Sequence, residues 1–424
     1  MSRRILILGG GTGGTLLANR LRRTCGRDTR ITVVDRDDEH IYQPGLLFVP
    51  FGLAEPASIV RSRRAQLRDG VEFTLGEVDR VDLAQNAVHL LDGTLLHYDV
   101  LVIATGAVLA PEETEGMLGE GWGSVVHTFY SLEGASALRE ALERFDCGRL
   151  VVNLIDMPIK CPVAPLEFCF LADWQLRERG VRDNVQVTFV TPLDGAFTKP
   201  VASAKLDALL GEKGIAVESE FATGRIDGAV RRIESWDGRQ LEFDLLVAIP
   251  VHGGPAYVQR SEGLGNPLGF IPADRHTLRS RAAANVFVIG DAADVPTSKA
   301  GSVTHFEGEI VAENVQRFLD GEELSGCYDG HANCFIETGF QRALLIDFDY
   351  DTEPLPGRFP EPHIGPLPLL EQSRLNHLAK LAFQPLYWSV LLPGYGIPGV
   401  SSHFHPPAGA PARTGAGAGA GAAP

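Results

Sequence analysis

The first 35 residues contain a strand, a glycine-rich turn, a helix, a second strand and an acidic residue, in that order. The apolar run from Ile5 to Leu8 leads into the turn, where Gly9, Gly11 and Gly14 match the spacing G-x-G-x-x-G. The first glycine allows a tight turn, the second lets the backbone approach a pyrophosphate, and the third lets the helix pack on the strand. Asp35 lies about 20 residues further on, where a carboxylate binds ribose hydroxyls. We therefore expect a dinucleotide-binding unit.

Length and composition predict a globular protein of two or three units. The chain has 424 residues, of which 44% are hydrophobic and 22% are charged, and each unit is large enough to bury its own core. The formal net charge of -16 argues against a nucleic-acid partner, because no basic stretch offsets the repulsion of phosphates. This charge does not exclude a membrane partner.

The start of the chain and the cysteine spacing predict the cellular compartment. The sequence runs directly from Met1 into the first strand, which leaves no room for a signal peptide, so we expect the folded body in the cytoplasm. Neither C-x-x-C nor zinc-type spacing occurs, which argues against structural disulfides and a metal site. We expect any disulfide here to be a redox device. The six cysteines are Cys25, Cys147, Cys161, Cys169, Cys327 and Cys334.

Two further apolar strands resemble a pair found in flavoproteins with two dinucleotide-binding domains. The run from Tyr98 to Ile103 ends in Ala104, Thr105 and Gly106, like the strand that leaves the FAD domain. The run from Asn285 to Ile289 ends in Gly290 and Asp291, like the returning strand, whose aspartate contacts the ribityl and phosphate end of FAD. The two motifs bracket an inserted domain.

The insert, at about residues 107–250, repeats part of the fold without a second phosphate-binding turn. The strand from Arg149 to Leu154 is present, but the following loop, residues 155–165, contains Cys161 and no G-x-G-x-x-G. The backbone therefore cannot close on a pyrophosphate as it does at Gly9. This difference argues against NAD(P)H binding.

Cys161 is the candidate reactive thiol in this loop. It precedes a predicted helix from Leu166 to Arg179 and follows Lys160. A helix N-terminus and a cation both lower the pKa of a thiol and favour the thiolate. The alternative is that Cys161 is a small buried residue without reactivity.

In combination, the motifs resemble those of sulfide:quinone oxidoreductases over about residues 3–400. The resemblance rests on the FAD motif, on Lys160-Cys161-Pro162 in place of the NAD turn and on Pro296 to Lys299. It also rests on a Tyr-Asp-Gly motif that begins at Tyr328, on Cys334, and on Asp-Phe-Asp-Tyr before an apolar C-terminal segment.

The resemblance implies roles for the two cysteines. Cys161 and Cys334 form a disulfide on the face of the flavin away from the quinone. Hydrosulfide attacks it and leaves a persulfide on one sulfur and a thiolate on the other, which passes electrons to FAD. Attack depends on the pKa of the leaving thiol, so a lowered Cys161 pKa would help. Which sulfur carries the persulfide stays open.

The resemblance also implies roles for an acid and a lysine. Glu167 matches an acid used for proton transfer in some members, and the alternative is a glutamate that stabilises the helix dipole. Lys299, which precedes Ala300 and Gly301, is expected near the flavin carbonyl edge, and the alternative is a surface lysine. His127 stands where many bacterial members carry a third cysteine, so we expect FAD to be bound non-covalently.

The C-terminal unit, residues 321–405, ends in an apolar segment from Leu375 to Tyr395 with helical spacing and aromatic residues suited to a membrane interface. Pro385 and Pro393 should break it, and no uninterrupted run reaches the about 20 residues needed to span a bilayer. Phe383 and Tyr387 lie one turn apart and are candidates to flank a quinone ring, with core packing or a dimer interface as alternatives. The Gly/Ala-rich tail, residues 406–424, is expected to be disordered.

These features predict an α/β fold with two Rossmann-like units and a C-terminal unit for membrane association or dimer formation. We assign residues 1–106 and 251–320 to the FAD unit, and 107–250 to the second Rossmann-like unit. The expected cofactor-binding residues are Gly9, Gly11, Gly14, Asp35, Thr105, Gly106, Asp291 and Gly301.

The predicted function is FAD-dependent oxidation of sulfide with reduction of ubiquinone or menaquinone. We expect a homo-oligomer that lies peripherally on the cytoplasmic side of the cell membrane, without metal or nucleic acid. Three alternatives remain: a flavoprotein subunit like that of flavocytochrome c sulfide dehydrogenase, a type II NADH:quinone dehydrogenase, and a non-catalytic FAD redox sensor.

Overall fold

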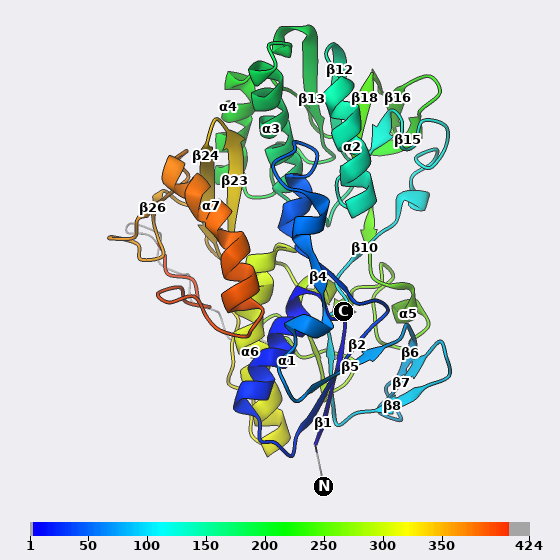
Figure 1. Cartoon of the computed structure of the whole chain (residues 1–424), viewed down its shortest axis with the longest axis vertical. Coiled ribbons are helices and arrows are strands. Elements are labelled where there is room, and N and C mark those ends of the chain that lie inside the picture. Colours follow the sequence, from blue (N-terminus) through cyan, green and yellow to red (C-terminus); the bar gives the residue numbers. More distant parts are fainter. Residues whose placement is uncertain (1–2, 407–424) are drawn as a thin grey trace, which may run out of the picture.

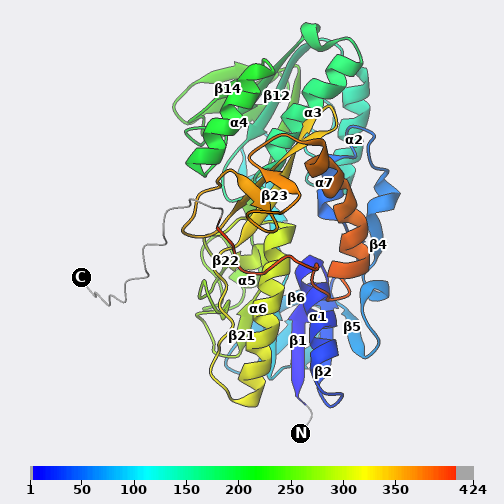
Figure 2. The same ribbon diagram turned by 90° about the vertical axis from the view of Figure 1, so that its left-hand side faces the viewer.

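The computed structural model describes residues 3–406 and arranges them as two α/β units along the long axis, with the C-terminal elements on one flank (Figure 1). The chain begins in the lower unit, crosses to the upper one and returns (Figures 1 and 2). Residues 407–424, most of the tail predicted to be disordered, lie outside the described residues.

The lower unit contains a parallel sheet in the order β21-β9-β1-β2-β5. Its interior strands are almost entirely apolar because both faces of the sheet are covered; Ile7 and Leu8, for example, are fully buried. The helices α1 and α6 pack together on one face. The bounds are β1 (Arg4–Leu8), α1 (Thr12–Thr24), β2 (Arg30–Asp35), β5 (Val71–Leu75), β9 (Val100–Ile103), β21 (Val286–Val288) and α6 (Gly301–Asp320).

The two predicted bracketing strands are neighbours in this sheet. Leu101 pairs with Val286 and Ile103 pairs with Val288, in parallel register. A long insertion therefore leaves the sheet after β9 and rejoins it beside the same strand. The interpretation of residues 98–106 and 285–291 as exit and return strands agrees with this register.

The upper unit contains a second parallel sheet, in the order β11-β18-β12-β13-β14, with helices packed on it (Figure 1). It is therefore a second Rossmann-like layer, and the predicted mixed α/β class is confirmed. The bounds are β11 (Val126–His127), α2 (Leu132–Arg144), β12 (Gly148–Leu154), α3 (Ala164–Glu178), β13 (Val185–Val190), α4 (Pro200–Glu212), β14 (Ala216–Glu218) and β18 (Leu245–Ile249).

Short strands and one short helix lie outside the two five-stranded sheets. Asp92 and Gly93 lie in the turn between β7 and β8, which pair in antiparallel register. The elements are β3 (Glu39–Ile41), β4 (Val60–Ser62), β6 (Val78–Asp82), β7 (Ala87–Leu90), β8 (Leu95–His97), β10 (Val108–Leu109), β15 (Thr223–Asp227), β16 (Arg232–Ser235), β17 (Gln240–Glu242), β19 (His252–Gly253), α5 (Ala256–Gln259), β20 (Ile271–Pro272), β22 (Ala293–Asp294), β25 (Gly357–Phe359) and β26 (Leu367–Leu369).

The C-terminal elements are an antiparallel pair, β23 (Ala332–Gly339) and β24 (Arg342–Phe348), and the helix α7 (Arg374–Leu386). The helix packs on β24 and β23, whereas β23 packs on α3 of the upper unit. Figure 2 shows α7 running beside the junction of the two α/β units. These elements therefore join the units rather than standing apart from them.

The prediction that Pro385 breaks the C-terminal helix is wrong. The helical path continues through Pro385 into a π-helical turn, Tyr387–Leu391. Proline lacks the N–H that would bond four residues back, and a wider π-turn is a common way for a helix to absorb such a defect. Within residues 3–406, no helix is both long enough and apolar enough to cross a membrane.

Candidate functional site

The glycine turn is closed by very tight backbone contacts. A Cβ atom at Gly9 would lie 2.4 Å from the carbonyl oxygen of Ala104, and one at Gly14 would lie 1.8 Å from that of Gly9. Gly9 also has a φ of +95°, which favours glycine. Only glycine therefore lets β1, α1 and β9 meet at this point, as the motif predicts.

Three predicted cofactor glycines instead face open space. Gly11, Gly106 and Gly301 come from three different elements, and a Cβ atom at each would have no neighbour within 4 Å. Gly11 caps α1 and Gly301 begins α6, so each of these two glycines lies at a helix N-terminus, where N–H groups are free to bind an anion. A pyrophosphate and a flavin need backbone that can be approached closely, so these residues fit FAD. FAD is the cofactor expected from the motifs, and the comparisons below support it.

Asp35 supports the glycine turn in the structure. Its Oδ2 accepts a hydrogen bond of 2.6 Å from the Gly10 N–H, and Arg63 Nη1 lies 3.3 Å from the same oxygen. The carboxylate therefore orients the turn. Its contact with the ribose hydroxyls stays a prediction.

Asp291 and Lys299 are buried together beyond the returning strand. Lys299 Nζ donates to the carbonyl oxygens of Asp291 and Ala293, at 2.7 and 3.0 Å, and lies 4.0 Å from the centre of the Phe270 ring. Burial raises the pKa of Asp291, and the positive charges of Lys299 and Lys160 oppose that rise. Lys299 is thus not a free surface lysine. Its expected role at the flavin edge stays a proposal.

The loop that carries Cys161 docks on the segment that enters α6. The Cys161 N–H donates to the Lys299 carbonyl at 2.6 Å, and the Cys161 carbonyl accepts from Ala164 N–H at 2.9 Å. Cys161 has a φ of +47°, an uncommon conformation for a residue other than glycine and one that often marks a functional site. The loop therefore brings a thiol of the upper unit to the edge of the FAD region.

Cys334 comes from β23 and meets the Cys161 region through packing of α3 on that strand. Its pKa is raised well above the ordinary value, first by burial and then by the negative charge of Cys161 and of Glu167. Ionisation of one thiol therefore opposes ionisation of the other. Both are free thiols in the structure, and their predicted disulfide stays a prediction.

Glu167 is bound to a lysine that sequence reasoning missed. Glu167, 2% exposed, accepts a hydrogen bond from Lys380 Nζ of α7 and one of 2.7 Å from the Glu337 N–H. Lys380 also donates to the Phe335 carbonyl at 3.0 Å. The spacing of α7 marks Lys380 only as a polar residue among apolar ones, so its place beside the cysteines could not be predicted.

The prediction of a lowered pKa at Cys161 is wrong. Burial and then the negative charge of Glu167 raise this pKa to about 12, although Lys380 and a hydrogen bond from the Ala164 backbone at the start of α3 lower it. Lys160 is not among the main causes of the shift, and its Nζ donates to Gln43 Oε1 at 3.5 Å. Cys161 also lies before the first turn of α3, which begins at Ala164. Lys380 is therefore the cation of the cysteine site.

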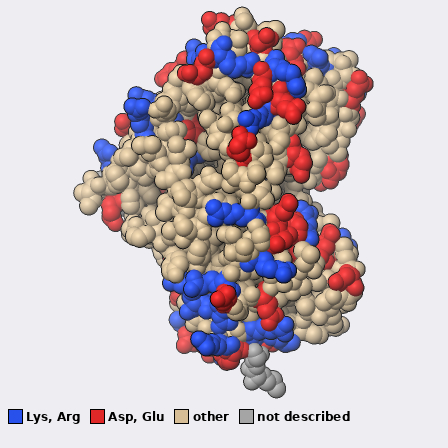
Figure 3. Space-filling view, in the orientation of Figure 1, with Lys and Arg blue, Asp and Glu red and all other residues tan. Residues whose placement is uncertain are grey.

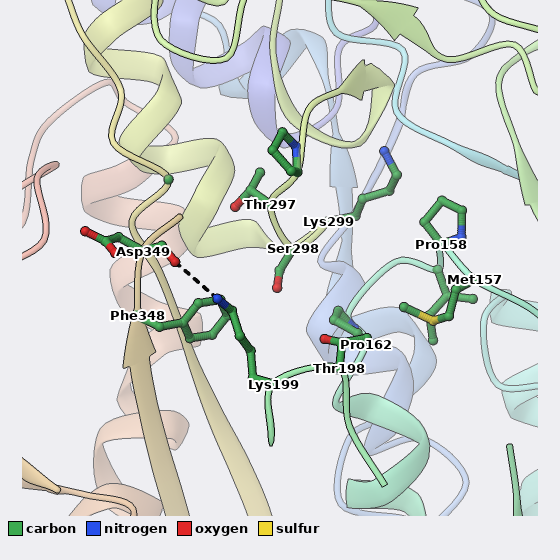
Figure 4. A pocket seen from close by; sticks show the side chains of 13 residues that line it. Met157, Pro158, Pro162, Thr198, Lys199, Thr297, Ser298, Lys299, Phe348 and Asp349 are labelled. Atoms are coloured by element: carbon green, nitrogen blue, oxygen red, sulfur yellow. Dashed lines mark hydrogen bonds between the residues drawn. The ribbon is translucent and has the colours of Figure 1, made fainter. Parts of the chain in front are cut away.

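A cavity of about 210 Å³ lies against the cysteine loop (Figure 4). Figure 4 shows Lys199 beside Phe348, donating to the Asp349 carbonyl at a distance of 3.4 Å. The residues on both sides of Cys161, Pro158 and Pro162, form part of the wall. The other lining residues are Met157, Ile159, Thr198, Lys199, Pro296, Thr297, Ser298, Lys299, Gly330, Phe348 and Asp349.

The two candidate quinone residues lie in an aromatic cluster. The Tyr387 ring is 4.9 Å from that of Tyr42 and 6.4 Å from that of Phe383, measured between centroids. Tyr387 is 3% exposed, and Phe383 is partly buried at the edge of the main core. The structure brings both residues to the loop after β3, and their contact with a quinone stays a proposal.

The structure also places Thr105, His127 and two further cysteines. Thr105 shares a hydrogen bond of 3.0 Å with the hydroxyl of Tyr257. His127 is buried in β11, and burial lowers its pKa. Cys147 is exposed before β12, whereas Cys169 is fully buried in α3.

Comparison with known proteins shows which proteins this chain is similar to. The profile of the pyridine nucleotide-disulphide oxidoreductase family matches residues 3–152. The mitochondrial sulfide:quinone oxidoreductase of Mus musculus is 27% identical over 399 residues, which cover 92% of this chain and 86% of that protein. The mitochondrial enzyme of Schizosaccharomyces pombe is 28% identical over 422 residues, with coverages of 91% and 89%.

A solved structure shows the same fold. The sulfide:quinone oxidoreductase of the bacterium Aquifex aeolicus superposes with a TM-score of 0.78 at 21% identity, over 93% of this chain and 92% of that one. The similarity in fold thus extends well beyond the glycine motif, over more than nine-tenths of both chains. This chain is similar to sulfide:quinone oxidoreductases over more than nine-tenths of its length, as its motifs predict.

Proposed function

We propose that this protein is an FAD-dependent sulfide:quinone oxidoreductase. The observation that carries the proposal is the position of Cys161, which stands where a phosphate-binding turn would be needed for NAD and docks on the Lys299 carbonyl beside the FAD region. When bound, FAD supplies a two-electron carrier between sulfide and quinone. The alternatives differ from this function in one respect each. A type II NADH:quinone dehydrogenase uses another electron donor, a flavocytochrome-type subunit uses another electron acceptor, and a redox sensor has no turnover.

The cysteines perform the sulfur chemistry. Hydrosulfide attacks one sulfur of a Cys161–Cys334 disulfide, a new S–S bond forms, and the bond between the two cysteines breaks. One cysteine then carries a persulfide, and the other becomes a thiolate that holds the released electron pair. Lys380 stabilises that thiolate, because its positive charge lowers the pKa of both cysteines.

Glu167 is proposed to hold Lys380 and to exchange a proton in the sulfur site. Burial raises the pKa of Glu167, and Lys380 opposes that rise. A carboxyl group with a raised pKa is better suited to donate a proton than an ordinary exposed carboxyl group. The positive charge of Lys380 would therefore be shared between the Glu167 carboxyl group and the newly formed cysteine thiolate.

The cavity beside the cysteine loop is proposed as the approach for hydrosulfide. Its wall includes Pro158 and Pro162, and Lys199 supplies a positive charge. Thr198→Trp should narrow it and lower kcat/KM for sulfide while FAD binding stays unchanged. An unchanged kcat/KM for sulfide would exclude this route.

The exposed face of α7 is proposed to lie on a membrane surface. Leu375, Leu378 and Leu381 are 44%, 57% and 48% exposed at helical spacing, and Figure 3 shows few charged side chains over the middle of the flank that α7 occupies. Such a face suits a helix that lies in the interface. Phe383 and Tyr387 would then line the path of a ubiquinone or menaquinone ring. The cytoplasmic side and a homo-oligomeric state are further parts of this proposal.

Vesicle sedimentation tests the membrane surface. The triple variant with glutamine at positions 375, 378 and 381 should lose most vesicle binding, whereas Leu95→Gln, which changes a 45% exposed leucine of β8, should retain it. If the triple variant binds vesicles normally but changes from an oligomer to a monomer, the face is a subunit interface.

Turnover tests the function itself. The purified protein should reduce decylubiquinone with sulfide as donor and form protein-bound sulfane sulfur. Flavin reduction by sulfide without any quinone turnover would favour a redox sensor, and turnover only with a haem protein would favour a flavocytochrome-type subunit.

A further inference from the structure

Tyr387 links the C-terminal helix to the glycine turn. Its hydroxyl lies 2.7 Å from the Thr12 hydroxyl and 2.6 Å from His40 Nε2. The opposite ring nitrogen of His40, Nδ1, lies 3.1 Å from the Gly10 carbonyl. Thr12 and Gly10 belong to the turn that should receive the pyrophosphate. We call this hydrogen-bonded chain the Tyr387 bridge.

The donor and the acceptor of each hydrogen bond in the Tyr387 bridge follow from the chemical groups involved. The Gly10 carbonyl can only accept, so Nδ1 of His40 carries the proton and Nε2 accepts from the Tyr387 hydroxyl. The Tyr387 oxygen then accepts from the Thr12 hydroxyl. Burial lowers the pKa of His40 to about 4, so the ring is neutral at pH 7, as this arrangement requires.

The chain that follows α7 extends this contact along α1. Asn19 Nδ2 donates to the Leu392 carbonyl at 2.7 Å, and Arg23 Nη1 donates to the Gly394 carbonyl at 2.7 Å. A Cβ atom at Gly394 would lie 2.7 Å from Arg20 N, so the two segments are in close contact. The C-terminal segment therefore holds α1 at its N-terminus, middle and C-terminal half.

We propose that Tyr387 is a positioning residue for FAD, whose hydroxyl holds Thr12 and Gly10 in the conformation that receives the pyrophosphate. Docking of α7 and binding of FAD are then coupled, and each strengthens the other by the same factor. Without the hydroxyl, a smaller fraction of the apoprotein has a binding-competent turn, and the apparent affinity falls by that fraction. The inference rests on FAD binding and not on the substrate, so a failure of sulfide oxidation would leave it intact.

Tyr387→Phe tests the Tyr387 bridge, because it removes the hydroxyl and keeps the ring that packs on Tyr42 and Phe383. Titration of apoprotein with FAD should show a Kd about tenfold higher than that of the unmodified protein, the effect of one buried hydrogen bond. Tyr350→Phe is the matched control, since that hydroxyl donates to the Arg275 carbonyl at 2.9 Å, away from the turn. The control should leave the Kd unchanged.

Two readouts separate positioning from simple stabilisation. FAD should raise the Tm of the unmodified protein more than that of Tyr387→Phe. Equal increases, with an unchanged Kd, would overturn the proposal and make Tyr387 a packing residue only. His40→Gln should weaken FAD binding to a similar extent. The double variant with Tyr387→Phe should have a Kd for FAD no higher than that of the single variant that binds FAD more weakly, because both substitutions interrupt the same Tyr387 bridge.

Hydrogen exchange tests the coupling without any substitution. In the unmodified protein, FAD should slow amide exchange in α7 and in the turn Tyr387–Leu391, although neither carries a predicted phosphate ligand. The same measurement on Tyr387→Phe should show little FAD-dependent protection there. Exchange in α7 that does not respond to FAD in the unmodified protein would overturn the coupling.

Discussion

The two Rossmann-like units differ most at one equivalent place, the junction between their central strand and the next helix. In the lower unit, β1 passes through Gly9 to Gly11 into α1, and the Cβ position of Gly11 faces open space at the start of the helix. In the upper unit, β12 passes through residues 155–163 into α3, and the loop carries Cys161 to the Lys299 segment of its neighbour. Under the proposed function, one junction receives a phosphate, whereas the other presents a sulfur. The same architecture can thus serve as a cofactor site and as a support for a redox residue.

The largest expected effect comes from Gly11→Val in the lower junction. The structure has open space at this Cβ position, so the variant should fold, but its side chain would occupy the pyrophosphate position and abolish FAD binding. Circular dichroism and flavin absorbance measure the two properties. Gly14→Ala, by contrast, should prevent folding, because its Cβ would lie 1.8 Å from the Gly9 carbonyl oxygen. Full flavin content in Gly11→Val would contradict the assignment of this junction.

The upper junction is tested by Cys161→Ser and Cys334→Ser. Each should lower sulfide:quinone turnover about a thousandfold, since neither sulfur can act without the other, and the double variant should be no worse than either single one. Cys25→Ser and Cys147→Ser are the controls and should retain activity. A double variant far less active than the single variants would rule out a shared disulfide.

The ion pair between Glu167 and Lys380 is expected to have a smaller effect. Lys380→Met leaves Glu167 buried without its cation, which should cost on the order of 3 kcal/mol of unfolding free energy. Combining it with Glu167→Gln removes the charge and should recover part of that loss. Thermal unfolding measures both, and turnover of each variant shows whether the pair also supports the sulfur chemistry. A double variant less stable than Lys380→Met alone would show that Glu167 has another essential partner.

The smallest expected effect is on the pH dependence of stability, through the contact of Glu307 with the turn before Asp291. Glu307 accepts a hydrogen bond of 2.6 Å from the Gly290 N–H, and burial raises its pKa to about 8. Because the folded pKa is above the unfolded one, the stability from protonated Glu307 is fully present below about pH 4.5 and is lost as the pH rises through about 8. Glu307→Gln keeps an acceptor and removes this dependence, so its Tm should decline less between pH 6 and pH 9, by on the order of 5 °C. Equal declines would show that Glu307 is ionised in the native protein at pH 6.

Local patterns predicted the lower junction well, and the distant contacts poorly. Glycine spacing and apolar strands are local signals, so Gly9, Gly11, Gly14 and the paired strands around residues 100 and 287 could be recognised. Lys380 and Tyr387 could not, because their partners, Glu167 and Thr12, lie 213 and 375 residues away in the chain. The pKa of Cys161 was mispredicted for the same reason, since sequence neighbours do not reveal burial.

The central claim is that the upper junction receives electrons from sulfide and not from NADH. Anaerobic titration of the purified flavoprotein with each donor, followed by flavin absorbance, tests this claim most directly. We predict that about one equivalent of sulfide bleaches the flavin of the unmodified protein, that Cys161→Ser is not bleached, and that NADH at micromolar concentration bleaches neither. Rapid bleaching by NADH, with sulfide ineffective, would contradict the account and identify the protein as an NADH:quinone enzyme.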